Sequence, residues 1–272
     1  MAKDQVRVHV PYAGGSFGLH STSGHDPASE AVQVARALDW KYPVKVQSLR
    51  QEELKAGRYR AMAVHRVRAG ADAQGRLTAF HQQIAAEPTS TNLPFAVDFL
   101  FKDGVDYMTT SGAVDGPYAL ANFKLETTNV QTGVPIMVWR SVGNSHTEFA
   151  RESAIDELAL AVGRDPVDLR RDLLGGNPRT LRALELAAER GGWGTPPPKG
   201  HARGIACSSF LDSHSAGLHG PCGAMRIFMV FASRSRSKAA GALSMLAISE
   251  VRSATWSAPS ASRAITSANS SA

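Results

Sequence analysis

Short runs with strand-like patterns of hydrophobic and polar residues occupy the first half of the chain. They are typical of β-strands and cover residues 6–10, 43–49, 62–68, 77–84, 123–130 and 134–139. The runs 62–68 and 77–84 flank a short segment that ends at Gly75, and this arrangement predicts a β-hairpin. Residues 88–116 are irregular apart from an apolar patch at 95–101. The first half therefore predicts sheet elements.

Hydrophobic residues at helical spacing occur once early in the chain, and this spacing is the main pattern after residue 143. Asp26 and Pro27 supply an N-cap and a proline at the first helical position, which predicts a helix to about Trp40. Further helices are predicted over 147–162, 165–174 and 178–189, each followed by glycine within two residues. The chain is therefore expected to be α+β, with mixed sheet elements in roughly 1–140 and a helical region to about 192.

The pattern fades between about residues 207 and 233, and no strand, capped helix or turn is recognisable afterwards. Twelve of the forty residues in 233–272 are serine, and Glu250 is the one acidic residue among them. A disordered Ser/Ala/Arg-rich tail is one explanation. Translation out of frame is the interpretation that we prefer, because a GC-rich gene read in a wrong frame tends to yield these residues. We expect a domain over 1–206 and a tail over 207–272.

Charge and cysteine content narrow the classes of function. The net charge is +6 and the isoelectric point is about 9.5, but +4 of this charge lies in 233–272. Residues 1–232 are nearly balanced, which argues against a nucleic-acid partner. Cys207, Cys222 and the nine histidines match no metal-ligand spacing, so no protein-bound metal site is expected.

Targeting signals are not apparent in the sequence as it stands. No apolar run approaches the roughly 20 residues that a membrane-spanning helix needs. No secretory signal follows Met1. A cytoplasmic location is therefore expected for the chain as written, while export of a longer parent protein stays open.

A glycine-rich segment follows the first predicted strand, at Gly14, Gly15, Ser16, Phe17 and Gly18. Glycines at such a position allow the backbone to approach a ligand closely or to adopt positive φ. The spacing is not that of a dinucleotide-binding loop, and the lysine of a phosphate-binding loop is missing. The segment predicts either a tight turn or a cofactor contact, and it argues against nucleotide binding.

A second polar segment precedes the predicted helix at 147–162. Here the run 134–139 leads to Arg140, Ser141, Val142 and Gly143. Backbone N–H groups at a helix start and a guanidinium group suit an anion or a polar cofactor. A surface arginine with an ordinary N-cap is the alternative.

These motifs, taken in order, resemble one family of enzymes. The Gly-Gly-x-Phe-Gly loop at 14–18 and Trp-Arg-Ser-Val-Gly at 139–143 are followed by matching segments at 152–159, 165–170 and 191–194. Over residues 6–206 the chain is similar to the molybdopterin-binding large subunit of the xanthine dehydrogenase/aldehyde oxidase family, most of all to the isoquinoline 1-oxidoreductase beta-subunit group. The resemblance implies part of a molybdenum-cofactor-binding domain of that type.

The resemblance also implies a site and an activity. The residues that it places at the molybdenum–molybdopterin cofactor are Gly14, Gly15, Phe17, Gly18, Arg140, Ser141, Val142 and Gly143. The family hydroxylates an N-heteroaromatic ring or an aldehyde with oxygen from water, and passes electrons to [2Fe–2S] clusters on a small partner subunit.

The chain departs from the family at the catalytic base. The family's glutamate stands in a Gly-Glu motif, and no Gly-Glu pair occurs in this sequence. A general base must lie within hydrogen-bond reach of its proton, and no residue is nominated for that role. We therefore expect an internal fragment of a molybdenum-dependent oxidoreductase that is inactive alone. The alternative is a non-catalytic fragment that acts at most as a subunit-interaction module.

Overall fold

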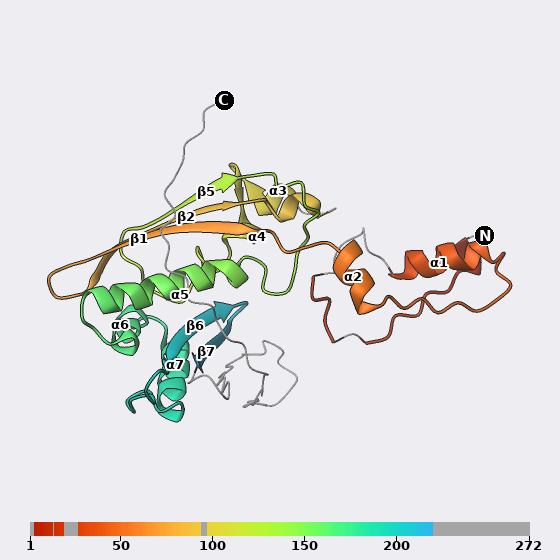
Figure 1. Ribbon diagram of the computed structural model, residues 1–272. Helices are drawn as coiled ribbons and strands as arrows, with labels where there is room; N and C mark the ends of the chain where they lie inside the picture. The colour runs from red at the N-terminus through yellow and green to blue at the C-terminus, as the bar shows by residue number, and fades with distance from the viewer. Residues whose placement is uncertain (1–2, 13, 19–26, 94–96, 220–272) are drawn as a thin grey trace.

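A three-stranded sheet forms the upper layer of the protein in Figure 1, a computed structural model that describes residues 3–12, 14–18, 27–93 and 97–219. Its order is β1-β2-β5, formed by β1 (Ala63–Ala71), β2 (Leu77–Ala86) and β5 (Phe123–Asn129). β1 and β2 are antiparallel, and β2 and β5 are parallel. The predicted hairpin and the predicted strand at 123–130 are confirmed.

Three helices and a second hairpin form the layer beneath the sheet (Figure 1). Helix α5 (Asn144–Ala161) lies along the sheet and is followed by α6 (Pro166–Leu173) and α7 (Pro178–Arg190). The antiparallel strands β6 (Gly204–Phe210) and β7 (Ser213–His219) lie beside α7. The predicted helices are confirmed, although α5 begins three residues earlier than expected.

The capping chemistry explains why these helices begin where they do. The side chain of Asp165 accepts a hydrogen bond from the N–H of Val167 at 2.7 Å, directly before α6. Asn177 accepts in the same way from the N–H of Thr180 before α7. A proline occupies the first turn of each helix. The backbone N–H groups there have no acceptor within the helix, so the N–H that proline lacks is not missed.

The main core lies between the sheet and the helical layer. Strand β2 contributes Leu77 and Phe80 to it, and Phe80 is completely buried and stacks on Phe123 of β5 with ring centroids 6.3 Å apart. Buried apolar residues from α5, α6, α7, β6 and β7 complete the same cluster. This core holds the second half of α5 through Ile155, Leu158 and Ala159.

Short elements connect these layers and extend away from them. Between β2 and β5 lie η3 (Ser90–Asn92), α3 (Val97–Leu100), β3 (Phe101–Lys102), β4 (Val105–Asp106) and α4 (Tyr107–Thr110). Toward the N-terminus, η1 (Lys3–Gln5), α1 (Pro27–Ala37) and α2 (Arg50–Ala56) lie apart from the sheet (Figure 1). None of the residues of α2 is buried. Within the described residues, no helix has both the length and the apolar character that crossing a membrane requires.

Several sequence-based predictions are wrong in detail. Residues 6–10 and 43–49 are extended but irregular, and they pair with no strand in the described part of the chain. Val8 and Val10 are 79% and 86% exposed, so alternation alone did not produce a strand without a hydrogen-bonding partner. The segment 134–139 makes a single bridge, between Ile136 and Tyr59.

The expected boundary at residue 207 falls inside β6. The hairpin of β6 and β7 continues the patterned region to His219. Residues 220–272, with Cys222, Glu250 and most of the proposed tail, lie outside the described residues.

Candidate functional site

The two polar segments singled out in the sequence lie against each other. The N–H of Arg140 donates to the carbonyl oxygen of Phe17 at 3.0 Å. Gly18 has a φ of +94°, and a Cβ placed on it would lie 1.9 Å from the carbonyl oxygen of Val138. Only glycine permits this contact of backbone with backbone. The contact brings residues 14–18 and 138–143 into one site, although more than 120 positions separate them in the sequence.

Left-handed backbone conformations occur in both segments of this contact. Phe17, Ser141 and Val142 have φ values of 52°, 73° and 45°. Such values are uncommon for residues other than glycine and are strained for a β-branched residue such as Val142. Strained backbone of this kind is often found at ligand sites, where the surrounding structure holds it in place.

Part of this turn is open to a ligand. Among the residues that the structure describes, the N–H groups of Ser141 and Gly143 have no hydrogen-bond acceptor, and Ser141 is exposed whereas Gly143 is buried. The guanidinium of Arg140 lies 5.7 Å from the ring centroid of Phe17, and both side chains are exposed. Gly14 has no atom within 4 Å of the position that a Cβ would take. The site therefore offers the N–H donor of Ser141, a cation and an uncrowded backbone, which fits an anionic, oxygen-rich cofactor.

Gly143 has a packing role that the sequence did not reveal. A Cβ on this residue would lie 2.6 Å from the carbonyl oxygen of Met108 and 2.8 Å from that of Thr109. Val142 packs beside it against a small cluster that includes Val138. Gly143 therefore lets the turn sit directly on the segment that contains α4.

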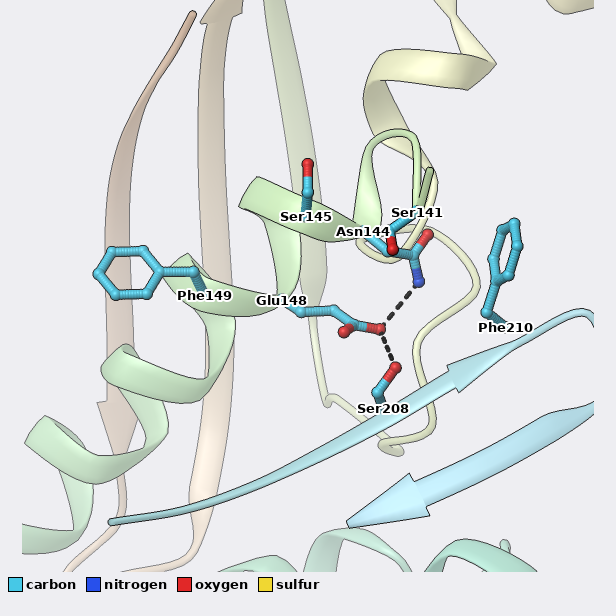
Figure 2. A pocket seen from close by; sticks show the side chains of 7 residues that line it. All are labelled: Ser141, Asn144, Ser145, Glu148, Phe149, Ser208 and Phe210. Carbon is cyan, nitrogen blue, oxygen red and sulfur yellow. Dashed lines mark hydrogen bonds between the residues drawn. The ribbon is translucent and has the colours of Figure 1, made fainter. Parts of the chain in front are cut away.

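A small pocket opens beside Ser141, at the start of α5 (Figure 2). Its volume is about 270 Å³. Its lining residues come from the turn, from α5 and from β6: Ser141, Asn144, Ser145, Glu148, Phe149, Ser208 and Phe210. The pocket thus joins the predicted cofactor turn to a hairpin that the sequence analysis had assigned in part to the tail.

Glu148 is the ionisable group in this pocket, and sequence reasoning missed it. Its Oε1 accepts hydrogen bonds from Asn144 Nδ2 at 2.8 Å and from Ser208 Oγ at 2.7 Å (Figure 2). Burial raises the pKa of Glu148. Asn144 and Glu148 are one helical turn apart, which the sequence could have shown. Ser208 comes from a distant strand, so no local signal identifies it.

A second polar contact lies on the other side of the start of α5. His146 Nδ1 is 2.9 Å from His65 Nε2 of β1, and His65 Nδ1 is 3.1 Å from Gln82 Nε2 of β2. Burial, together with the nearby His65 and Arg60, lowers the pKa of His146 to about 4. Both rings therefore stay neutral at pH 7 and share one hydrogen bond.

A buried ionic network anchors α5 from below. Glu152 Oε2 accepts hydrogen bonds from Tyr118 Oη at 2.9 Å, from Arg170 Nε at 3.0 Å and from the backbone N–H of Cys207 at 2.9 Å. Arg151 and Arg170 are at most 1% exposed. This network ties together α5, α6 and β6, and none of its residues lines the pocket beside Ser141.

Comparison with known proteins places the chain in a family. Residues 1–174 match the model of the molybdopterin cofactor-binding domain. The chain is 26% identical over 222 residues to isoquinoline 1-oxidoreductase subunit beta of Brevundimonas diminuta, which covers 79% of this chain and 27% of that protein. It is 34% identical over 171 residues to the aldehyde oxidoreductase molybdenum-binding subunit PaoC of Escherichia coli K12, which covers 61% of this chain and 21% of that one.

The fold is also similar to that of a solved structure. Quinoline 2-oxidoreductase from Pseudomonas putida 86 matches with a TM-score of 0.56 and 21% identity, over 73% of this chain and 27% of that chain. The chain thus spans about a quarter of the length of the relatives that it matches.

Proposed function

The chain belongs to the family of molybdopterin cofactor-binding domains, and we propose that it forms one wall of the molybdenum-cofactor site of a hydroxylase. The relatives named for isoquinoline, quinoline and aldehyde oxidation support an N-heteroaromatic or aldehyde substrate for the whole enzyme. In this proposal, oxygen comes from water and the electrons leave through a [2Fe–2S] small subunit. When bound, the cofactor supplies the redox-active molybdenum at which the substrate is oxidised.

The observation that carries this proposal is the contact between residues 14–18 and 138–143. Gly14 and Gly15 keep the exposed backbone free of side chains, so that the cofactor can approach it closely, while Gly18 admits the carbonyl of Val138 that joins the two segments. The exposed N–H group of Ser141 would donate to a cofactor oxygen atom.

The side chains of the turn complete the wall. Arg140 adds positive charge toward the anionic group. Phe17 supports the Arg140 guanidinium and excludes water from one side of the site. Val142, held in a left-handed conformation, fixes the direction of the neighbouring N–H groups.

Cofactor retention by the full 272-residue chain tests the proposal. The chain is coexpressed with the enzymes of cofactor synthesis, and bound pterin is measured by fluorescence after oxidation, together with molybdenum by mass spectrometry. Gly14→Ala is the diagnostic variant, because a Cβ at Gly14 meets no protein atom and should leave the fold unchanged. We expect it to reduce pterin retention, while Gly176→Ala, at another uncrowded glycine, should not.

Equal retention by Gly14→Ala and the wild type would place the cofactor elsewhere. Because the sequence contains no Gly-Glu motif, we also expect no dye-linked oxidation of isoquinoline by this chain alone.

A subunit-interaction module is the second candidate function. A groove of about 580 Å³ runs between β1 and α5. Large apolar side chains are exposed on these two elements, with Val64 62%, Phe149 76% and Leu160 83% exposed. Exposed apolar patches mark surfaces that another protein covers. A chain that binds no pterin but elutes as a defined complex with the small subunit would favour this candidate.

A further inference from the structure

Arg60 is held beside the cofactor turn by its neighbours in the chain. The N–H of Tyr59 donates to the carbonyl oxygen of Pro135 at 2.8 Å, and the N–H of Met137 donates to the carbonyl oxygen of Tyr59 at 3.0 Å. The indole Nε1 of Trp139 donates to the carbonyl oxygen of Arg58 at 3.2 Å. These bonds, made by the two residues that precede Arg60, hold its backbone next to the turn.

The guanidinium of Arg60 reaches across the turn and bonds to both of its ends. Nη2 donates to the carbonyl oxygen of Arg140 at 2.9 Å. Nη1 donates to Ser145 Oγ at 2.9 Å and to the carbonyl oxygen of Val142 at 3.4 Å. The guanidinium carbon also lies 5.9 Å from the ring centroid of Trp139. The two left-handed residues, Ser141 and Val142, therefore lie inside the span that Arg60 bridges.

The positive charge of Arg60 lies at the N-terminal end of α5, where it does not stabilise the helix. Arg60 contacts Ser145 in the first turn of α5, where the helix dipole disfavours positive charge. Burial of the guanidinium lowers the pKa of Arg60, so the surroundings also disfavour its charge. The bonds to the turn offset both effects. A planar fork of donors can bridge two carbonyl groups and a hydroxyl, whereas the ammonium of lysine cannot reproduce this geometry.

We infer that Arg60 is a positioning residue, which holds Ser141 and Val142 in the left-handed conformation that presents the exposed N–H group of Ser141 to the cofactor. The inference rests on the proposed function for its link to molybdopterin. The effect of Arg60 on the turn itself can be measured without any cofactor.

Hydrogen exchange of the full 272-residue chain measures this effect. We compare the wild type with Arg60→Lys and Arg60→Gln, and follow the backbone amides of Arg140 and Val142, which donate to the carbonyl oxygens of Phe17 and Trp139. The Arg60 side chain is exposed overall, so these changes open no cavity in the core. We expect exchange in the turn to become at least about tenfold faster in both variants, the factor that corresponds to about 1.4 kcal/mol. Exchange in β2 should stay unchanged.

The matched control is Arg58→Gln, which removes the same charge two residues away. The bond from Trp139 uses the backbone of Arg58 and survives this change. Addition of methylguanidinium to Arg60→Ala should restore part of the slow exchange, because it returns the planar donors to their place. Wild-type exchange rates in Arg60→Gln, or equal acceleration in Arg58→Gln, would overturn the inference.

Pterin retention in the same samples separates this inference from the proposed function. If the wild type binds pterin and Arg60→Lys binds less, the position of the turn matters for the cofactor. If Arg60→Lys exchanges fast but binds as much pterin as the wild type, the link to the cofactor is wrong. If the wild type binds none, the proposed function fails for this chain, and the exchange data still decide whether Arg60 positions the turn.

Discussion

The histidine pair at the start of α5 makes the stability of this protein depend on pH. His146 and His65 share one hydrogen bond of 2.9 Å, and Gln82 contacts the other nitrogen of His65. Burial, with smaller effects of His65 and Arg60, lowers the pKa of His146 to about 4, and burial also lowers the pKa of His65. A proton added to both rings would place two cations with centroids 5.0 Å apart.

The direction of the effect follows from the pKa in each state. In the unfolded chain His146 binds a proton with the usual histidine pKa of about 6.5, and in the folded protein it binds one only near 4. Between these values the unfolded state holds more protons, so the free energy of unfolding falls as the pH falls. The loss of unfolding free energy that His146 causes is absent above pH 6.5, grows as the pH falls below it and is complete near pH 4.

The size of the effect follows from the same two values. The difference between 6.5 and about 4 corresponds to at most about 3.5 kcal/mol, since one pKa unit is about 1.4 kcal/mol. His146 is only partly buried, and contact with water reduces the expected effect to about 2 kcal/mol.

Urea unfolding of the wild type and of His146→Gln at pH 7.5 and pH 4.5 measures this contribution. Glutamine keeps a hydrogen-bonding group but cannot take up a proton. The loss of stability between the two pH values should be about 2 kcal/mol smaller in the variant. His201→Gln, at an exposed position, should lose as much as the wild type. An equal loss in all three proteins would refute the reasoning.

Three further changes test the packing around the site. Gly18→Ala should destabilise the protein by about 1–3 kcal/mol, because its Cβ would collide with the carbonyl of Val138 at a positive φ; an unchanged melting temperature in circular dichroism would contradict the close contact. Glu152→Ala should cost about 3–5 kcal/mol in urea unfolding, because it leaves Arg170 buried without its main partner. A loss below about 1 kcal/mol would mean that water enters the network. Phe80→Ala should cost about 3–5 kcal/mol by the same assay, and a surface-like loss of under about 0.5 kcal/mol would show that the sheet does not pack on α5 as described.

The helical half of the fold could be predicted from the sequence, because its signals are local. Asp165 and Asn177 mark helix starts, the prolines that follow fit the first turn, and glycine occurs near each end. The hairpin of β1 and β2 could be predicted for the same reason, since its two strands and its turn are neighbours in the chain. Residues 6–10 and 43–49 show the limit of this reasoning. They carry a strand pattern, but a strand also needs a partner, and alternation does not specify one.

The sequence by itself determined which residues are suited to the site. The glycines at 14–18 and the arginine, serine and glycine at 140–143 were recognisable as groups that can approach and bind a polar cofactor. Only the tertiary structure decided that the two segments touch, through Gly18 and Val138, and that Arg60 bridges the turn. It also decided that Glu148 meets Ser208 from a strand beyond the expected domain boundary. Spacing along the chain reports backbone conformation over a few residues. The tertiary contacts of this site join residues that are between 60 and more than 120 positions apart in the sequence. They depend on how the sheet and helices pack, and no local pattern encodes them.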